Sequence, residues 1–267
     1  SPTVATWTKN TTPNWSFIAT GLDYACALKP TGEAYCWGNN TYGQLGDGTN
    51  TARTFPTPVP GGHLFATISV GAQHTCGTIL NDTTTYCWGR NTYGALGDNT
   101  TTNQSVPTLV SGGLALDNIS AGHDHTCGLD ASGNAYCWGL NTSTQLGLGN
   151  GGGNSDDKYT PTAVSGGLTF LEISAGSTQT CGRQSGDAVA CWGGNSFGEL
   201  GDGANKDKNA PTSITGTYSN IYAFQNGTCG INSSSNEGFC WGDDQFLQVG
   251  DEDRKSTRLN SSHQIIS

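Results

Sequence analysis

A chain of 267 residues with 40 glycines and only 12% charged side chains is a poor candidate for a helical protein, because glycine destabilises a helix interior by about 1 kcal/mol relative to alanine. The formal net charge of −10 argues against a nucleic-acid-binding surface, since such surfaces need clustered lysine and arginine, and none occurs before residue 253. No stretch approaches the roughly 20 consecutive apolar residues that a bilayer span requires. We therefore predict no nucleic-acid partner and no membrane span in this segment.

The chain contains five copies of one pattern, about 50 residues apart. Each copy has a cysteine pair that ends in Cys-Trp-Gly, at residues 26–38, 76–89, 127–139, 181–193 and 229–242. An Ile-x-x-Gly stretch precedes the pair in four copies, beginning at Ile18, Ile68, Ile119 and Ile173. A Leu-Gly step follows it, at Leu45, Leu96, Leu146 and Leu200, with Val249 in the fifth copy. A Pro-Thr pair opens each copy, at Pro2, Pro56, Pro107, Pro161 and Pro211.

Within a copy, short runs of β-branched and apolar residues, such as residues 66–80 and 171–182, predict β-strands. Turn residues between the cysteines, such as Pro30-Thr31-Gly32, predict a hairpin. A sheet of four short strands can bury both faces when such sheets stack radially, so the predicted fold is an all-β propeller over residues 1–252. The expected blades are residues 2–55, 56–106, 107–160, 161–210 and 211–252. An all-β solenoid is the alternative, although a solenoid coil usually needs fewer residues.

Two longer motifs carry a family resemblance. Ser-Ala-Gly-x-x-His-Thr-Cys-Gly-Leu (120–129) and Tyr-Cys-Trp-Gly-x-Asn-x-x-Gly-Gln-Leu-Gly-Asp-Gly (35–48) resemble the repeat of the regulator of chromosome condensation family. The resemblance covers residues 1–252 and implies a propeller of seven blades when complete, so five blades should form an open arc. The cysteine pairs make the chain most similar to secreted bacterial members and to the extracellular repeats of plant crinkly-type receptor kinases. The fifth copy departs most, with Phe224 in place of the usual glycine.

The ten cysteines form five pairs with none left over. Facing residues of a hairpin can lie about 4 Å apart between Cβ atoms, which suits a disulfide, and the Cys-x-x-Cys spacing of zinc sites is absent from the sequence. Disulfides persist in oxidising compartments, so we expect an extracellular, cell-surface or periplasmic location. The predicted bonds, each within one blade, are Cys26–Cys36, Cys76–Cys87, Cys127–Cys137, Cys181–Cys191 and Cys229–Cys240.

Asn-x-Ser/Thr triplets mark possible glycosylation sites. A chain rich in asparagine, serine and threonine also produces such triplets by chance, and in a bacterium they would carry no meaning. The acceptor positions are Asn10, Asn14, Asn39, Asn81, Asn99, Asn103, Asn118, Asn141, Asn226 and Asn232.

Candidate chemical groups can be judged by whether they recur. His74 and His125 share the position before Thr-Cys, which predicts a structural role in a strand. His123 could share a strand face with His125 and form a metal pair, but no third ligand is identifiable. The tryptophan of each Cys-Trp-Gly is expected to pack the blade, although a row of tryptophans could also stack on sugars. Gly-Asp-Gly at residues 46–48 and 201–203 weakly suggests a calcium or phosphate loop, and equally forms an ordinary turn.

No nucleophile elbow or zinc-protease motif occurs in the sequence. We therefore predict no catalytic residue, no cofactor, no metal site and no enzyme. The leading hypothesis is a secreted or cell-surface module that binds a protein or glycan through propeller loops, such as residues 147–160 and 201–210. The alternatives are guanine-nucleotide exchange on a small GTPase, by family analogy alone, and a structural role in an extracellular layer or filament.

The last fifteen residues, 253–267, lack the repeat. Residues 253–263 hold three of the eleven basic residues and resemble one reading frame of a sequencing adapter. We expect a non-native or disordered tail that does not extend a sheet, because it has no alternating apolar pattern. A genuine basic, disordered tail is the alternative.

Overall fold

The computed structural model describes residues 14–150, 156–244 and 263–264, and their regular structure is almost entirely β-strand. A 3-10 turn at Ser185–Asp187 is the one helical element among these residues. The first sheet consists of β1 (Phe17–Thr20), β2 (Tyr24–Leu28), β3 (Ala34–Gly38) and β4 (Arg53–Pro58). The second consists of β5 (Phe65–Val70), β6 (His74–Ile79), β7 (Thr85–Gly89) and β8 (Gln104–Leu109). The third consists of β9 (Asn118–Ala121), β10 (His125–Leu129), β11 (Ala135–Gly139) and β12 (Lys158–Ala163).

The fourth and fifth sheets share one long strand, which corrects the expectation of five separate sheets. They consist of β13 (Glu172–Ala175), β14 (Gln179–Arg183), β15 (Ala188–Gly193), β16 (Lys208–Phe224), β17 (Gly227–Asn232), β18 (Gly238–Gly242) and β19 (His263–Gln264). The first part of β16 pairs with β15 and its second part with β17. Earlier connections contain two successive glycines with positive φ, such as Gly61 and Gly62, which interrupt the strand. The corresponding connection before β17 has only Gly216 and stays extended.

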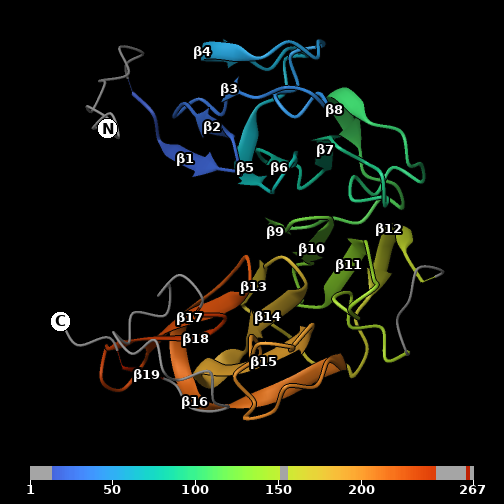
Figure 1. Cartoon of the computed structure of the whole chain (residues 1–267). Helices are drawn as coiled ribbons and strands as arrows, with labels where there is room; N and C mark the ends of the chain where they lie inside the picture. The colour runs from blue at the N-terminus through green and yellow to red at the C-terminus, as the bar shows by residue number, and fades with distance from the viewer. Residues whose placement is uncertain (1–13, 151–155, 245–262, 265–267) are drawn as a thin grey trace, which may run out of the picture.

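The sheets follow one another around an open arc (Figure 1). The strands β1, β5, β9 and β13 lie on its inner side and β4, β8 and β12 on its outer side, while the first and fifth sheets occupy its two ends. Successive sheets make contact through β2 with β5, β6 with β9, β10 with β13 and β14 with β16. The predicted all-β propeller with an open arc of blades is confirmed.

Each Pro-Thr pair of the described residues lies in an outer strand. Its threonine is opposite the second cysteine of the same sheet: Thr57 faces Cys36, Thr108 faces Cys87, Thr162 faces Cys137 and Thr212 faces Cys191. The expected blade boundaries at these pairs therefore fall inside outer strands, because the pair completes one sheet before the chain turns inward to begin the next. The division at residue 252 stays a prediction, since residues 245–262 lie outside the described part of the chain.

All five predicted disulfides are present, and each joins directly facing residues of one hairpin. The Cα–Cα distance is 4.1 Å in every pair: Cys26–Cys36, Cys76–Cys87, Cys127–Cys137, Cys181–Cys191 and Cys229–Cys240. Closing a loop of about ten residues stabilises each hairpin by roughly 2–3 kcal/mol. The prediction that every bond stays within its blade is confirmed.

The expectation that the tail does not extend a sheet is wrong for two residues. His263–Gln264 form β19, which pairs antiparallel with β18, with His263 opposite Cys240. An edge strand offers backbone N–H and C=O groups to any extended segment, so this pairing needs no alternating apolar pattern. The rest of the tail lies outside the described residues, and its non-native origin stays a prediction.

The hydrophobic core lies between sheets, in four separate clusters. The cluster between the first two sheets brings Cys26, Cys36 and Leu45 against Phe65, Ile68 and Trp88 of the next sheet. The other clusters combine the disulfide and leucine of one sheet with an isoleucine and the Cys-Trp-Gly tryptophan of its successor. The predicted packing role is confirmed for four of the five tryptophans, since Trp88, Trp138 and Trp192 have no exposed surface and Trp241 is buried. Trp37, in the first sheet, is half-buried and belongs to none of the four clusters.

We call the packed contact between two successive sheets a joint. One backbone carbonyl oxygen accepts hydrogen bonds across the joint between the first two sheets. The Gln44 carbonyl accepts hydrogen bonds from Trp88 Nε1 at 3.0 Å and from Thr75 Oγ1 at 2.9 Å. A Cβ on Gly46 would lie 2.6 Å from Trp88 Nε1, so only glycine permits this approach. The same pair of bonds reaches the carbonyls of Ala95 and Gln145 in the next two joints.

A second hydrogen bond crosses two of the joints. His74 Nε2 lies 2.9 Å from Thr126 Oγ1, and His125 Nε2 lies 2.9 Å from Thr180 Oγ1. Each threonine already donates its hydroxyl hydrogen to a backbone carbonyl, so Nε2 of each histidine must be the donor in this bond. In the neutral ring, Nδ1 then carries no proton. Gln179 holds the equivalent position and donates from Nε2 to the carbonyl of Gly227. The predicted structural role of both histidines is confirmed.

These histidines predict a loss of stability in acid. Burial lowers the pKa of His74 to about 4 and that of His125 to about 3, whereas an unfolded histidine titrates near 6.5. Below pH 6.5 the unfolded chain therefore binds protons that the folded chain excludes, and stability falls towards the folded pKa values by roughly 1.4 kcal/mol per histidine per pH unit. Urea unfolding of the wild type and of His125→Gln between pH 7.5 and 5 measures this slope. The variant, which copies the glutamine of the next sheet, should lose less stability, and equal slopes would contradict the assignment.

The open end of the first sheet gives a matched pair of substitutions. Ile18 and Ile68 occupy the same repeat position, but Ile18 is 57% exposed and Ile68 is 3% exposed, because Ile68 packs into the first joint. Ile68→Ala should lower the free energy of unfolding by about 2–5 kcal/mol through the cavity it leaves, and Ile18→Ala by less than about 1 kcal/mol. Chemical denaturation of both variants tests this. Equal losses would show that the joints are not the core.

Candidate binding site at the axis

The five turns that follow the innermost strands meet near the axis of the arc. A Cβ on Gly71 would lie 2.4 Å from the carbonyl oxygen of Gly122, and a Cβ on Gly122 would lie 2.5 Å from that of Gly176. The glycine of the Ile-x-x-Gly stretch therefore allows neighbouring turns to touch through their backbones. The contact is fixed by backbone bonds, such as that from Ala72 N to Gly122 O at 3.0 Å. Phe224 holds this position in the fifth sheet, and its carbonyl accepts a hydrogen bond from Gln179.

These turns line a shallow, open hollow of about 230 Å³. All five sheets line it with equivalent residues, at positions 20–22, 70–72, 121–123, 175–177 and 223–225. The residue that follows the glycine position differs in every sheet: Leu22, Ala72, His123, Ser177 and Gln225. At this position the first two sheets therefore present apolar side chains to the hollow and the last three present polar ones.

Next to the hollow lies a group of side chains that we call the Arg90 cluster: Tyr42, Gln73, Arg90, Tyr93, His123 and Asp124. Arg90 Nη1 lies 3.0 Å from Asp124 Oδ1 and 3.2 Å from Gln73 Oε1. His123 Nδ1 lies 2.7 Å from Asp124 Oδ2. The guanidinium carbon lies 5.6 Å from the ring centroid of Tyr42 and 5.7 Å from that of Tyr93, within the range of cation–π attraction.

The charges of this cluster depend on one another. The hydrogen bond with Asp124 raises the pKa of His123, and this outweighs the opposite effect of partial burial. Burial would raise the pKa of Asp124, but the hydrogen bond from His123 and the charge of Arg90 lower it overall. Asp124 therefore stays ionised and orients both cationic side chains.

Sequence reasoning missed both features. The signal was present in the residue after each Ile-x-x-Gly, which varies while its neighbours recur, and in Arg90, whose position holds no cation in other copies. His123 was considered only as a metal ligand together with His125. In the structure His123 lies in the turn before β10, whereas His125 is buried in a joint, so the two rings serve different places.

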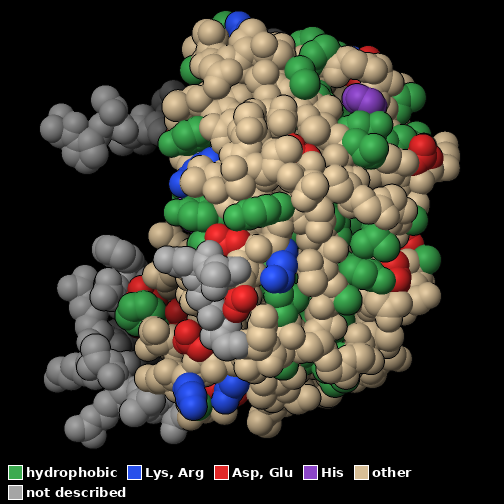
Figure 2. Space-filling view, turned by 90° about the vertical axis from the view of Figure 1, so that its right-hand side faces the viewer, with side chains coloured by type: hydrophobic (Ala, Val, Ile, Leu, Met, Phe, Trp, Pro, Cys, Tyr) green, Lys and Arg blue, Asp and Glu red, His purple; other side chains and the backbone are tan. Residues whose placement is uncertain are grey.

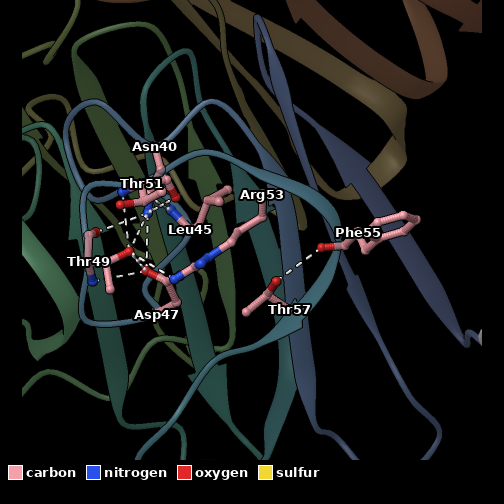
Figure 3. A network of polar contacts seen from close by, with 8 residues as sticks. All are labelled: Asn40, Leu45, Asp47, Thr49, Thr51, Arg53, Phe55 and Thr57. Carbon is pink, nitrogen blue, oxygen red and sulfur yellow. Dashed lines mark hydrogen bonds and ion pairs between the residues drawn. The ribbon is translucent and has the colours of Figure 1, made fainter.

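The Gly-Asp-Gly loop is closed by its own side chains (Figure 3). Asp47 accepts hydrogen bonds from the backbone and hydroxyl of Thr49 and pairs with Arg53. Asn40 donates to Asp47 Oδ1 and accepts from the backbone N–H of Leu45. The Arg53 guanidinium thus already balances the charge of Asp47, which supports an ordinary turn rather than a calcium or phosphate loop. The fourth sheet repeats the arrangement with Asn195, Asp202 and Lys208.

The possible glycosylation sites differ in their solvent exposure, and some of the predicted positions lie outside the described residues. Part of the loop at residues 147–160 falls outside the described residues, and so does Asn10. Asn141 is buried, with 1% of its surface exposed, and its Oδ1 accepts a hydrogen bond from the backbone of Leu146. Among the other acceptor positions, Asn14, Asn81, Asn99 and Asn103 are exposed, and Asn39, Asn118, Asn226 and Asn232 are half-buried.

No group of three or more histidine, cysteine, aspartate or glutamate side chains in residues 14–150, 156–244 and 263–264 is arranged to hold a metal ion. A helix with the length and apolarity of a membrane span was not found in these ranges.

Comparison with known proteins identifies related sequences. The chain is 31% identical over 206 residues to the ultraviolet-B receptor UVR8 of Arabidopsis thaliana, which covers 74% of this chain and 45% of the receptor. It is 30% identical over 237 residues to the probable E3 ubiquitin-protein ligase HERC4 of Homo sapiens, which covers 84% of this chain and 21% of the ligase. The chain therefore spans less than half the length of these relatives.

Solved structures share the fold. Prp20p from Saccharomyces cerevisiae superposes with a TM-score of 0.74 at 20% identity, over 87% of this chain and 58% of Prp20p. The ectodomain of the receptor kinase CR4 from Physcomitrella patens superposes with a TM-score of 0.58 at 22% identity, over 85% of this chain and 50% of that structure.

A family model described as the regulator of chromosome condensation (RCC1) repeat matches residues 31–77, 83–129 and 132–182. A second model with the same description matches residues 15–44 and 117–145. These matches lie between residues 15 and 182 and include the first three cysteine pairs, the first three Leu-Gly steps and the first four axial turns described above. The chain therefore belongs to the regulator of chromosome condensation (RCC1) repeat family.

Proposed function

We propose that this chain is a non-catalytic module that acts outside the cytosol and binds a protein or glycan partner with the face around the axial hollow. The observation that carries the proposal is the variety of the five side chains at one repeat position: Leu22, Ala72, His123, Ser177 and Gln225. Residues that hold the sheets together recur from copy to copy, whereas these do not. Variable side chains on turns of a rigid scaffold are a common basis of recognition.

Two further observations support the proposal. His74 and His125 are committed to joints between sheets, which leaves neither ring free for acid–base chemistry. The outer side of the arc is a weaker candidate for recognition: Figure 2 shows its hydrophobic side chains scattered among charged groups, other side chains and backbone. Phe55, which is 77% exposed on β4, points away from the loop network in Figure 3.

The location outside the cytosol is supported by the five disulfides. If a eukaryotic cell secretes the chain, we expect glycans at exposed acceptors such as Asn81 and Asn99. A glycan on Asn141 is incompatible with the burial of that side chain.

Binding at the hollow predicts the effect of filling it. Ser177→Trp places a large ring at the rim of the hollow and should lower capture of a partner from extracellular fractions at least tenfold, because the ring occupies the space that the partner needs. The measurement is quantitative mass spectrometry of proteins retained by the immobilised chain. Phe55→Ser, on the outer side of the arc, is the control and should retain the partner. A partner retained equally by both variants would contradict a site at the axis.

The proposed location predicts the thiol state of the natural protein. Chain isolated from its source without reductant should show no free thiol on alkylation and mass spectrometry. Under increasing dithiothreitol, Cys229–Cys240 should open first, because Cys229 is half-buried whereas the cysteines of the other four pairs are fully buried. Free thiols in the isolated protein would argue for a reducing compartment and against the proposal.

A further inference from the structure

Arg90 is the central residue of the Arg90 cluster. Blade packing does not explain an arginine at this repeat position, and the N–H groups of one of its nitrogens are not used by its described neighbours. The residue three positions after the second cysteine is Arg90 in the second copy, and it is Asn39, Leu140, Gly194 or Asp243 in the others. A residue that the blade needs recurs at its repeat position, as the tryptophans do. An arginine that occurs once is therefore a candidate for a role outside blade packing.

The contacts of Arg90 leave one guanidinium nitrogen, Nη2, available. Nη1 is held by Asp124 and Gln73, and Nε lies 3.3 Å from Thr92 Oγ1. Nη2 donates to no residue of the described ranges, and 23% of the side chain is exposed. Two tyrosine rings restrict the group, so little conformational freedom would be lost when it binds a ligand. A fixed guanidinium nitrogen with two N–H groups is suited to a carboxylate through charge-assisted hydrogen bonds.

The local charge favours an anion when His123 is protonated. Arg90 and His123 then contribute two positive charges against one negative charge on Asp124. The other titratable groups that act on His123 or Asp124 are the buried His74 and His125, which stay neutral above about pH 4 because burial lowers the pKa of both. The hydrogen bond with Asp124 raises the pKa of His123 above that of a free histidine, and the fraction of charged His123 increases as the pH falls. An anion should therefore bind more tightly in mild acid.

The neighbouring hollow favours a peptide over a sugar. Its volume of about 230 Å³ is below the range of roughly 300–1,000 Å³ typical of small-molecule pockets, and it suits one or two side chains. The part of the hollow formed by the first two sheets carries the apolar side chains of Leu22, Val70 and Ala72. None of the Cys-Trp-Gly tryptophans, which could stack on sugar rings, lines the hollow: Trp88, Trp138, Trp192 and Trp241 are buried between sheets, and the half-buried Trp37 is not among the lining residues. Arginine and tyrosine are also the residues that contribute most often to protein–protein hot spots.

From these observations we propose that the Arg90 cluster binds a carboxylate of an acidic peptide segment, whose adjacent side chain enters the axial hollow. This inference rests on the proposed binding function and names the chemistry of the partner.

The test measures binding of a blocked hexaglutamate peptide to the full chain by calorimetry at pH 5.5 and pH 8.0. Salt at 0.15 M gives a screening length of about 8 Å, so acidic residues farther away than this repel the peptide only weakly. Hexaglutamate should bind at least fivefold more tightly at pH 5.5, and hexaglutamine should not bind at either pH. His123→Gln should remove the pH dependence, and Arg90→Gln should weaken binding at least tenfold. Absent or pH-independent binding of hexaglutamate to the wild type would overturn the inference.

Matched variants separate charge from folding. Arg183→Gln removes another arginine that pairs with two carboxylates, those of Glu172 and Asp187, and should leave peptide binding unchanged. Arg90→Lys keeps the charge without the planar fork and should bind more weakly than the wild type but more tightly than Arg90→Gln. The two Arg90 variants should keep the wild-type unfolding temperature within a few degrees. If Arg90→Gln lowers the unfolding temperature by more than this, the inference is judged from Arg90→Lys alone. Binding of hexaglutamate by Arg90→Lys with the wild-type affinity would then overturn the inference.

Two further outcomes distinguish this inference from the proposed function. Tighter binding of an oligoglucuronate of equal charge than of hexaglutamate would replace the peptide with an acidic glycan. A natural partner retained equally by the wild type and by Arg90→Gln would overturn the carboxylate site and leave the binding function intact.

Discussion

The first three joints between sheets each depend on one buried backbone carbonyl, and in the fourth, among the described residues, the carbonyl of Glu199 receives only the hydroxyl of Thr228. The carbonyls of Gln44, Ala95 and Gln145 each receive an indole N–H and a threonine hydroxyl from the following sheet. A buried carbonyl without such partners would cost about 1–3 kcal/mol, so each sheet is committed to its successor. The tryptophan that supplies the donor also fills the apolar cluster, and a glycine makes room for it. Polar and apolar contributions therefore act through the same residue.

This arrangement separates the residues that hold the fold from those available for recognition. Cysteines, tryptophans, threonines and the Ile-x-x-Gly glycines meet between sheets or near the axis and recur in nearly every copy. The residue after each glycine only has to fit beside its neighbours, so it differs in each sheet. Arg90 and His123 have the same freedom, and the conserved geometry of the sheets places them next to each other although they belong to different copies.

Recurrence explains which features could be predicted from the sequence. The cysteine pairs, the hairpins between them and the packing of tryptophan follow from a pattern that is present five times. The continuous strand β16 was missed because it depends on a single local difference, the loss of one glycine before Thr217. The placement of Pro-Thr in an outer strand was missed because a repeat has no intrinsic starting point in sequence. The Arg90 cluster was missed because its members, such as Tyr42 and Asp124, lie in three copies and approach one another only after the sheets stack.

The chain of joints also implies a particular kind of cooperativity. Among the described residues, the main contacts between sheets join each sheet to its neighbours in the arc, so the stability of the molecule is close to a sum of sheet terms and nearest-neighbour terms. The inner sheets have two joints each, whereas the first and fifth have one, and the first leaves Ile18 and Phe17 exposed. Unfolding should therefore begin by fraying at the two ends and move inwards. The axial hollow, to which every sheet contributes, would lose its shape at this first stage, before most of the secondary structure is lost.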